Sequence, residues 1–496
     1  MPLAKKLAQL LLLFASPLVF AGSDLPRWEQ KVVEYQLPNG MKFLLVSRGE
    51  APTFNAIIRF RVGSMDEEPG KTGLAHLFEH MAFKGGQNFG TRNYKAEKPI
   101  LNEIEKTGQR LSEEYAKGEK ADPGKILEIR TKLRELHNAE EKHIVKEEIS
   151  KIIEEAGGHH FNATTGQDMT SYFVSLPSVQ LELWAKIESE AIFNGVLREF
   201  YEERDVVLEE RRMRLENDPS TKLYEKLIAT AFPDGHPYQG MTIGRKQDLL
   251  TLTRTDAERF FARHYTPANA VGAIVGRISI PEVKGILDRY FSSIPSKKAA
   301  PARSIPPLLL DKEKRVVLEE KAEPRLVVAY YKPTLPDQDD IIFDLIDQIL
   351  SGGATSRLYK RLVLEKKIAS GIDSYTDIPG SRLPNLFFIS AEPVRPHTAG
   401  ELEKGILEIL GEFKEKGPTE TELEQAKNKL KSQFIWGLKT NEGIASRLTY
   451  FEILGGWRYL TQYLSRVEGV TPEEIRKAAQ KYLVAERRVV GELRKK

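Results

Sequence analysis

The chain contains 496 residues, which is too many for one hydrophobic core and predicts two or more domains. Its net charge of +3, with acidic and basic residues mixed along the chain, argues against a nucleic-acid-binding protein. The sequence has no cysteine, so disulfides, thiolate metal sites and a cysteine nucleophile are excluded. A metal ion would have to be bound by histidine and carboxylate side chains.

The first 21 residues have the pattern of a signal peptide. Lys5 and Lys6 precede an apolar stretch that ends at Phe20, and Val19-Phe20-Ala21 is typical of a cleavage site. The stretch is short for a transmembrane helix, and an uncleaved anchor is the alternative. We therefore expect residues 1–21 to be removed and the mature protein to be exported, with the periplasm as the expected compartment and no stable membrane insertion.

Alternation of apolar and polar residues predicts the elements of the first half. In chain order they are a hairpin over 32–47 around Pro38-Asn39-Gly40, a strand over 55–62, a short helix over 74–83, a strand over 164–176, helices over 181–193 and 199–216, and a helix followed by a strand over 260–275.

Residues 101–155 differ from their surroundings because they are dense in Glu and Lys. Ile126, Ile129, Leu133 and Leu136 form one narrow apolar stripe at helical spacing. Asp122-Pro123-Gly124 divides the segment into two arms. The pattern predicts a helical hairpin over about 101–155 inserted into the first domain, with its charges in solvent.

Residues 293–307 are rich in Pro, Ala, Ser and Lys and are a predicted linker. Beyond them the pattern restarts, with strands over 315–318 and 325–331 and a helix over 338–350. The two halves also end alike, with a helix and then a strand over 259–275 and over 476–490. We therefore predict an α+β fold of two divergent copies of one domain, over 22–292 and 308–496.

The most informative motif is His76-Leu77-Phe78-Glu79-His80. Residues four apart lie on the same face of a helix, so His76 and His80 can bind one metal ion. Glu79 lies beside them and can take a proton from water at the metal. The order H-x-x-E-H is the reverse of the commoner H-E-x-x-H zinc motif. The alternative, for the motif by itself, is a pair of packed or surface histidines with an exposed glutamate.

Three segments carry a resemblance to a known family. They are Gly63 to Ala75 with Phe83-Lys84-Gly85, then Asn162-Ala163-Thr164-Thr165 with Asp168, Thr170 and Tyr172, and then Glu203 to Glu210. They resemble the active-site region of the pitrilysin family of zinc peptidases, which includes insulin-degrading enzyme and mitochondrial processing peptidase. The resemblance implies a zinc metallopeptidase that cleaves short or unfolded peptides. It also implies domains made of mainly antiparallel sheets packed with helices, together forming half of a clamshell chamber.

The resemblance also supplies a third metal ligand. The family carries two glutamates seven residues apart, of which the second binds zinc and the first supports the site. Here these are Glu203 and Glu210, and seven residues make two helical turns, so both can face the metal helix. Glu209 points about 100° away, and an ordinary charged helix is the alternative. The expected site is one Zn²⁺ per chain on His76, His80 and Glu210, with Glu79 and Glu203 in catalysis.

The segment 162–172 resembles the edge strand on which this family binds an extended peptide. An open sheet edge offers unpaired backbone groups to any peptide, so recognition there tolerates many sequences. Asn162, Ala163 and Thr164 are therefore the predicted substrate-binding residues, with a plain core strand as the alternative. His159 and His160 precede this strand and are expected on the surface.

The second half lacks a feature of single-chain relatives. They carry an Arg and a Tyr, seven residues apart, that bind substrate, whereas the matching positions here are Val363 and Ser370. Arg361 and Lys366 lie nearby if the alignment slips. The resemblance therefore implies a homologous subunit that supplies the Arg/Tyr pair, with a homodimer as the alternative. A non-catalytic assembly or peptide-binding subunit of the same fold is the alternative function.

Overall fold

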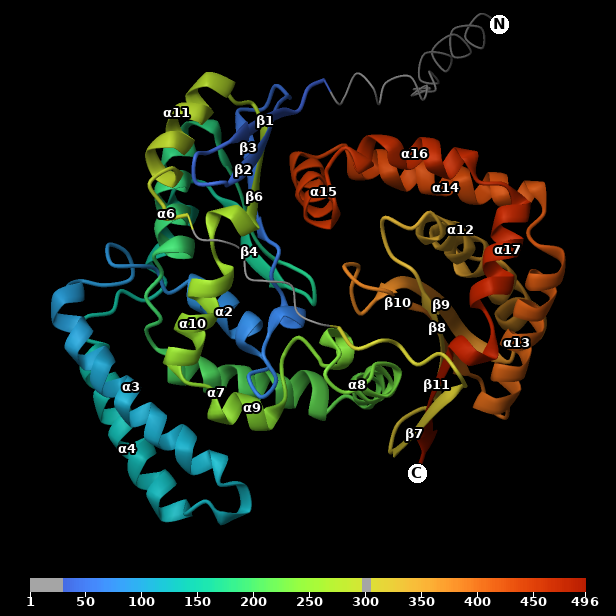
Figure 1. Ribbon diagram of the computed structural model, residues 1–496, viewed down its shortest axis with the longest axis horizontal. Helices are drawn as coiled ribbons and strands as arrows, with labels where there is room; N and C mark the ends of the chain where they lie inside the picture. The colour runs from blue at the N-terminus through green and yellow to red at the C-terminus, as the bar shows by residue number, and fades with distance from the viewer. Residues whose placement is uncertain (1–29, 297–304) are drawn as a thin grey trace, which may run out of the picture.

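The computed structural model describes residues 30–296 and 305–496. The predicted signal peptide lies outside the described residues, and so does the central part of the predicted linker, 297–304. The described residues form two halves, each built on one β-sheet with helices packed against it (Figure 1).

The two sheets share one strand order. The first is β1-β2-β6-β3-β5-β4 and the second is β7-β11-β8-β10-β9, so only β1 has no counterpart. In each sheet one parallel pair, β2 with β6 or β7 with β11, joins the first and last strands of the common pattern, and the other pairs are antiparallel. This repeat agrees with two copies of one α+β domain. The strands are β1 Val33–Gln36, β2 Lys42–Ser47, β3 Thr53–Phe60, β4 His159–Thr165, β5 Thr170–Pro177, β6 Ala270–Gly276, β7 Lys314–Glu320, β8 Arg325–Lys332, β9 Ala369–Ile378, β10 Asn385–Pro393 and β11 Arg488–Lys495.

The helices of the structure include those predicted over 74–83, 181–193, 199–216 and 338–350, together with others that were not predicted. In the first half they are α2 Leu74–Ala82, α3 Tyr94–Ala116, α4 Pro123–Glu140, α5 Glu148–Glu155, α6 Leu181–Phe193, α7 Phe200–Arg211, α8 Pro219–Ala231, α9 Lys246–Thr251, α10 Arg254–His264 and α11 Ile280–Phe291. In the second they are α12 Asp339–Ser351, α13 Ala399–Lys416, α14 Glu420–Gly437, α15 Asn441–Leu454, α16 Tyr459–Gly469 and α17 Pro472–Tyr482.

The single strand predicted over 164–176 was wrong. The chain forms a hairpin instead, because β4 ends at Thr165 and β5 begins at Thr170. The amide of Gly166 donates to the carbonyl of Met169 at 3.0 Å and closes a tight turn between the two strands. Consequently only the β4 part of the predicted strand lies at an edge of the sheet, and Tyr172 lies on β5 inside the sheet.

The two halves exchange one helix each. Helix α15 of the second half packs on the first sheet, where Ile444 and Leu448 join the apolar cluster that contains Ile57 of β3. Helix α8 of the first half packs on the second sheet, where Leu223 and Leu227 join the cluster of β11. Figure 1 shows α15 beside β6 and α8 near β7 and β11. Each sheet is therefore covered on one face by a helix from the other half.

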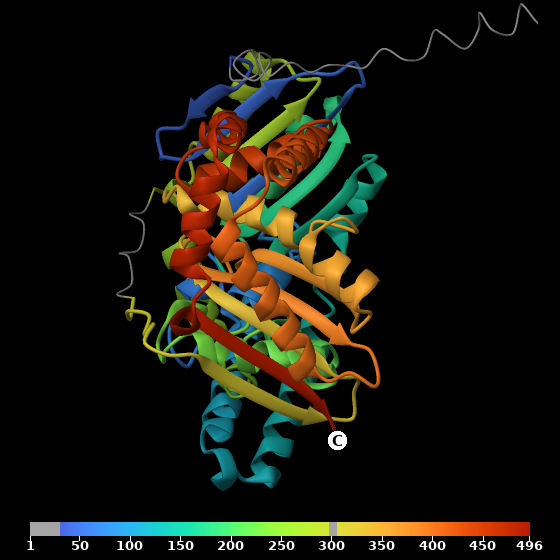
Figure 2. The same cartoon turned by 90° about the vertical axis from the view of Figure 1, so that its right-hand side faces the viewer.

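The charged hairpin is present with different bounds. It consists of α3 and α4, so it begins at Tyr94 and ends at Glu140, and it projects below the body of the molecule in Figure 2. Its base is part of the main core, because Ile104 and Leu111 belong to that cluster. Leu101 is buried as well. Helix α5 is separate from the hairpin, and its Ile149 and Ile153 also lie in that core. The insertion predicted over 101–155 therefore starts and ends too late, and residues 116–127 at the tip contain no buried side chain.

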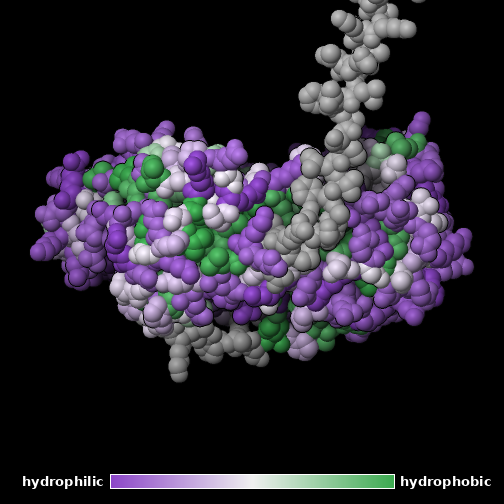
Figure 3. Space-filling model, turned by 90° about the horizontal axis from the view of Figure 1, so that it is seen from above, coloured by the Kyte–Doolittle hydropathy of each residue, from purple (hydrophilic) through white to green (hydrophobic). Residues whose placement is uncertain are grey.

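In the part of the chain that the structure describes, no helix combines the length and the apolar character needed to cross a bilayer. Most of the face seen in Figure 3 is hydrophilic, interrupted by apolar patches.

Candidate metal centre

Helix α2 presents two different faces. Leu74, Leu77, Phe78 and Met81 are buried in the core of the first half, while the histidines and the glutamate of the motif share a half-buried face. Spacings of three and four residues put these three side chains within one helical turn. The helix begins after Gly73, whose φ of 95° is accessible to glycine at little cost.

The two histidines converge on Glu210 of α7. The Nε2 atoms of His76 and His80 each lie 3.7 Å from Oε2 of Glu210. The three candidate ligand atoms lie within 4.8 Å of one another, and no other such group of three was found among the described residues. Ligands about 2.1 Å from a tetrahedral metal ion lie about 3.4 Å apart, slightly less than the two separations of 3.7 Å. The structure therefore brings all three predicted ligands together.

The donor set fits zinc, which is bound by neutral imidazoles and carboxylates. Burial lowers the pKa of His76 to about 4, so its imidazole is neutral at pH 7. Burial also lowers the pKa of His80, but the hydrogen bond with Glu203 and nearby carboxylates outweigh burial and raise the pKa overall. Because Nδ1 of His80 is taken by Oε2 of Glu203 at 3.2 Å, Nε2 stays available for a metal.

Two cations hold the glutamates of α7 in place. Lys84 binds Oε1 of Glu203 at 2.6 Å and Oε2 of Glu199 at 2.9 Å. Burial raises the pKa of Glu203, but the hydrogen bonds with His80 and Lys84 lower it by more than burial raises it. The pKa is therefore lowered overall, and the carboxylate stays ionised. Arg214 binds Oε1 of Glu210 at 2.7 Å, which leaves Oε2 for the histidines.

The sequence did not identify Lys84 or Arg214 as site residues. Each lies four residues after a predicted ligand, Lys84 after His80 and Arg214 after Glu210. For Arg214 that spacing was the available signal, since side chains four apart on a helix are neighbours. Lys84 lies beyond the end of α2 and binds residues distant in sequence, so its position gave no such signal.

Glu79 is half-buried on the same face as the ligands. Burial raises its pKa, while Thr165 at the end of β4 and the nearby His80 lower it. A raised pKa brings a carboxylate closer to the range in which it can both accept and return a proton.

Strand β4 lies at the edge of the first sheet and beside α2. Phe161 of β4 contacts Phe83, with ring centroids 5.3 Å apart. Asn162 and Thr164 are exposed, and Ala163 is buried. The amide of Ala163 donates a hydrogen bond to Oδ1 of Asn162 at 2.9 Å. The predicted peptide-binding residues therefore sit on an open edge next to the metal ligands.

In the second half, the two matching residues make contacts within their own half. Val363 packs against the core of its own half, and Ser370 contacts Glu392. The two nearby cations are also engaged, because Arg361 pairs with a glutamate at 2.7 Å and Lys366 with another at 3.1 Å.

Two family models match the chain. The one described as "Insulinase (Peptidase family M16)" matches residues 42–119, which include His76, Glu79 and His80. The one described as "Peptidase M16 inactive domain" matches residues 251–430, which contain none of the metal-centre residues.

Known proteins of this family align along most of the chain. The zinc protease PqqE of Helicobacter pylori is 26% identical over 96% of this chain and 95% of its own. Mitochondrial-processing peptidase subunit beta of Lentinula edodes is 24% identical over 90% and 86%.

Solved structures show the same fold. A protease from Helicobacter pylori superposes with a TM-score of 0.78 at 24% identity, covering 94% of this chain and 99% of that one. The periplasmic protease PqqL of Escherichia coli superposes with a TM-score of 0.69 at 18% identity, and this chain covers only 47% of it. These matches confirm the predicted resemblance: the chain belongs to the insulinase family of peptidases, family M16.

Proposed function

We propose that this chain is a zinc-dependent peptidase that cleaves short or unfolded peptides. The observation that carries the proposal is the convergence of His76 Nε2 and His80 Nε2 on Oε2 of Glu210, each at 3.7 Å. A zinc ion held by these residues would supply a Lewis acid that polarises a carbonyl and makes water acidic enough to lose a proton near neutral pH. The relatives named as zinc proteases support this choice of metal.

The residues of this chain supply the remaining chemistry. Glu79 accepts the proton that water loses and returns it to the leaving amine, a role that its raised pKa favours. A peptide adding to the open edge of β4 would displace Asn162 Oδ1 from the Ala163 amide and offer its own carbonyl there. Because β4 lies beside α2, a peptide bound on this edge runs past the metal ligands.

The chain is further proposed to act with a homologous subunit after export to the periplasm. Val363 and Ser370 cannot replace the Arg/Tyr pair, and Arg361 and Lys366 are engaged by glutamates of their own half. The chain also spans 47% of the fold-related PqqL chain, as one half of a two-half enzyme would. A homodimer is the competing arrangement.

The test is zinc content and peptide cleavage by the purified chain that begins near Gly22. We expect about one zinc per chain and slow cleavage of a quenched fluorescent peptide by the chain alone. Adding the homologous subunit should restore a fast rate, which stops with a chelator and returns with added zinc. His76→Ala should lose both properties, while the exposed control Glu209→Gln should keep them. Zinc binding without cleavage, even with a homologous partner added, would favour the assembly-subunit alternative. Full activity of the isolated monomer would contradict the need for a partner.

A further inference from the structure

The second half contacts the first half at a site that is connected, through a short segment, to the metal-binding helix. The contact, here called the domain junction, consists of Asp66, Asp168 and Tyr238 from the first half and Ser381 and Arg382 from the second. Ser381 and Arg382 lie on the turn between β9 and β10.

Arg382 makes the ion pair of the junction. Its Nη1 and Nη2 contact the two carboxylate oxygens of Asp66 at 2.8 and 3.3 Å, and Nη1 also donates to the backbone carbonyl of Asp168 at 3.1 Å. The side chains of Arg382 and Asp66 are only 13% and 18% exposed, so solvent screens the pair weakly. A two-pronged contact of this kind fixes orientation as well as distance.

The side chain of Asp168 receives the rest of the turn. Its carboxylate accepts hydrogen bonds from the hydroxyl of Tyr238 at 2.5 Å and from the amide of Ser381. The fit leaves no spare room, because a Cβ on Gly380 would lie 2.6 Å from Oδ2 of Asp168. The β9–β10 turn is therefore seated on the tip of the β4–β5 hairpin.

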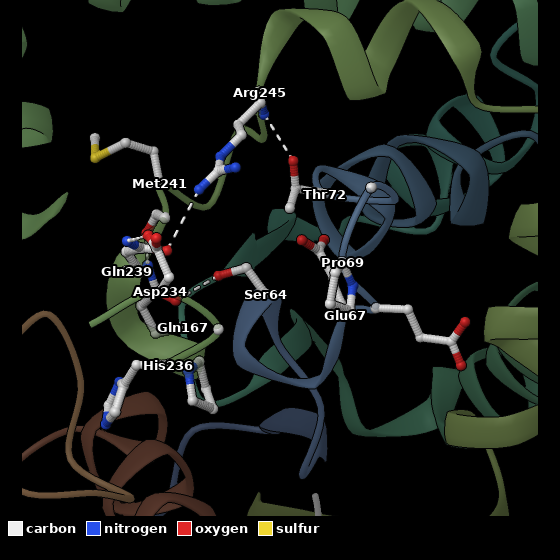
Figure 4. A pocket seen from close by; sticks show the side chains of 15 residues that line it. Ser64, Glu67, Pro69, Thr72, Gln167, Asp234, His236, Gln239, Met241 and Arg245 are labelled. Carbon is white, nitrogen blue, oxygen red and sulfur yellow. Dashed lines mark hydrogen bonds between the residues drawn. The ribbon is translucent and has the colours of Figure 1, made fainter. Parts of the chain in front are cut away.

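The short segment around Asp66 connects this contact to both functional elements. The amides of Ser64 and Met65 donate to the carbonyls of Gly166 and Gln167 in the β4–β5 turn, at 3.2 and 3.0 Å. Ser64 Oγ also donates to Oε1 of Gln167 at 2.7 Å (Figure 4).

Glu67, which follows Asp66 in the chain, contacts the start of the metal-binding helix α2. Its carboxylate accepts from the amides of Gly73 and Ala75 at 2.9 and 2.8 Å, where α2 begins. These amides belong to the first turn of the metal-binding helix, where N–H groups have no carbonyl partner within the helix. The four residues Ser64 to Glu67 thus join the peptide-binding hairpin, the metal helix and Arg382.

We propose that Arg382 is a positioning residue for peptide binding, through which the second half holds the β4 edge strand in register with the metal ligands. The inference rests on the proposed peptidase function. It gives the half without a metal site a specific task, which is to anchor the hairpin that receives the substrate. Arg382 itself touches neither the metal ligands nor the open edge of β4.

The test compares Arg382→Ala with Arg395→Ala. Arg395 follows the same pair of strands but makes an exposed ion pair with Glu323 at 3.2 Å, so its loss should change nothing. In the zinc-loaded, cleavage-deficient Glu79→Gln background, we expect Arg382→Ala to weaken binding of a fluorescein-labelled unstructured peptide by about tenfold or more. Amide exchange across 159–177 should become faster, while zinc affinity and exchange across 203–210 stay unchanged.

Arg382→Lys keeps the charge but loses the two-pronged geometry and should show an intermediate effect. If Arg382→Ala fails to fold, Arg382→Lys provides the test in its place. Unchanged hairpin exchange, or unchanged peptide affinity, in the folded Arg382 variants would overturn the inference. The proposed function fails separately, through absence of zinc or of Glu79-dependent cleavage in the parent protein.

Discussion

Replacing Glu203 with glutamine tests how the metal centre is supported. Glu203 accepts from two donors at once, His80 Nδ1 at 3.2 Å and Lys84 Nζ at 2.6 Å. Glutamine has the same shape but one acceptor oxygen and one NH₂ group. Whichever way the amide turns, one of the two donors then faces another donor.

The magnitude follows from that lost contact. A hydrogen bond to a charged group is worth about 1.5–3 kcal/mol. If His80 loses its acceptor, its ring is no longer held with Nε2 toward Glu210, and zinc binding must restore that orientation. We therefore expect the zinc dissociation constant to rise about 10- to 100-fold, the usual range for partners of metal ligands.

The assay is competition with a chromogenic zinc chelator at fixed pH. Glu209→Gln is the matched control, because Glu209 lies on the same helix, is 52% exposed at its side chain and pairs with Arg212 instead. Its zinc affinity should equal that of the parent. Equal affinities of Glu203→Gln and Glu209→Gln, with both proteins folded, would refute the reasoning.

Three other changes probe the catalytic base, a buried carboxyl and the hairpin. Glu79→Gln should retain zinc and lose peptide cleavage by about 10²-fold or more, as expected for a general base; near-parental rates would exclude that role. Burial raises the pKa of Glu188 to about 8, so the folded state holds this proton more tightly than the unfolded state, and stability should fall as the pH rises from about 4.5 toward 8. Urea denaturation should show that Glu188→Gln is more stable than the parent at pH 8 by at least about 1 kcal/mol. At pH 5 most of this difference in stability should disappear. An equal difference at pH 5 and pH 8 would contradict the raised pKa of Glu188. Replacing residues 116–127, none of which is buried, by a short Gly/Ser bridge should leave a folded protein with full zinc content, whereas removing 101–155 should give insoluble protein.

The metal ligands on α2 were predictable because their geometry is local. A spacing of four residues fixes the relation of His76 to His80 whatever the rest of the fold does. Glu210 was different, since it lies in a helix that also carries Glu202, Glu203 and Glu209. Only the family resemblance selected it, and only the packing of α7 against α2 brings it to the histidines.

The missed features depend on contacts between distant segments. The predicted bounds of the hairpin were wrong because the charge-rich pattern of α3 masked Leu101 and Ile104, whose burial depends on the elements that cover them. The β4–β5 turn was not predicted because Thr, Tyr and Phe around Gly166 are typical of one continuous strand. Arg382 carried no sequence signal, since its partner Asp66 is more than 300 residues away.

The exchange of α8 and α15 means that each sheet has one face whose hydrophobic cluster is completed by the other half. If the chain were cut between its halves and the pieces separated, the first sheet would lose Ile444 and Leu448 and the second would lose Leu223 and Leu227, all of which are fully or almost fully buried. Each piece would then present a bare apolar sheet face to water. The two homologous units should therefore melt in a single cooperative transition, and a nick in the connecting segment should leave the fragments bound to each other.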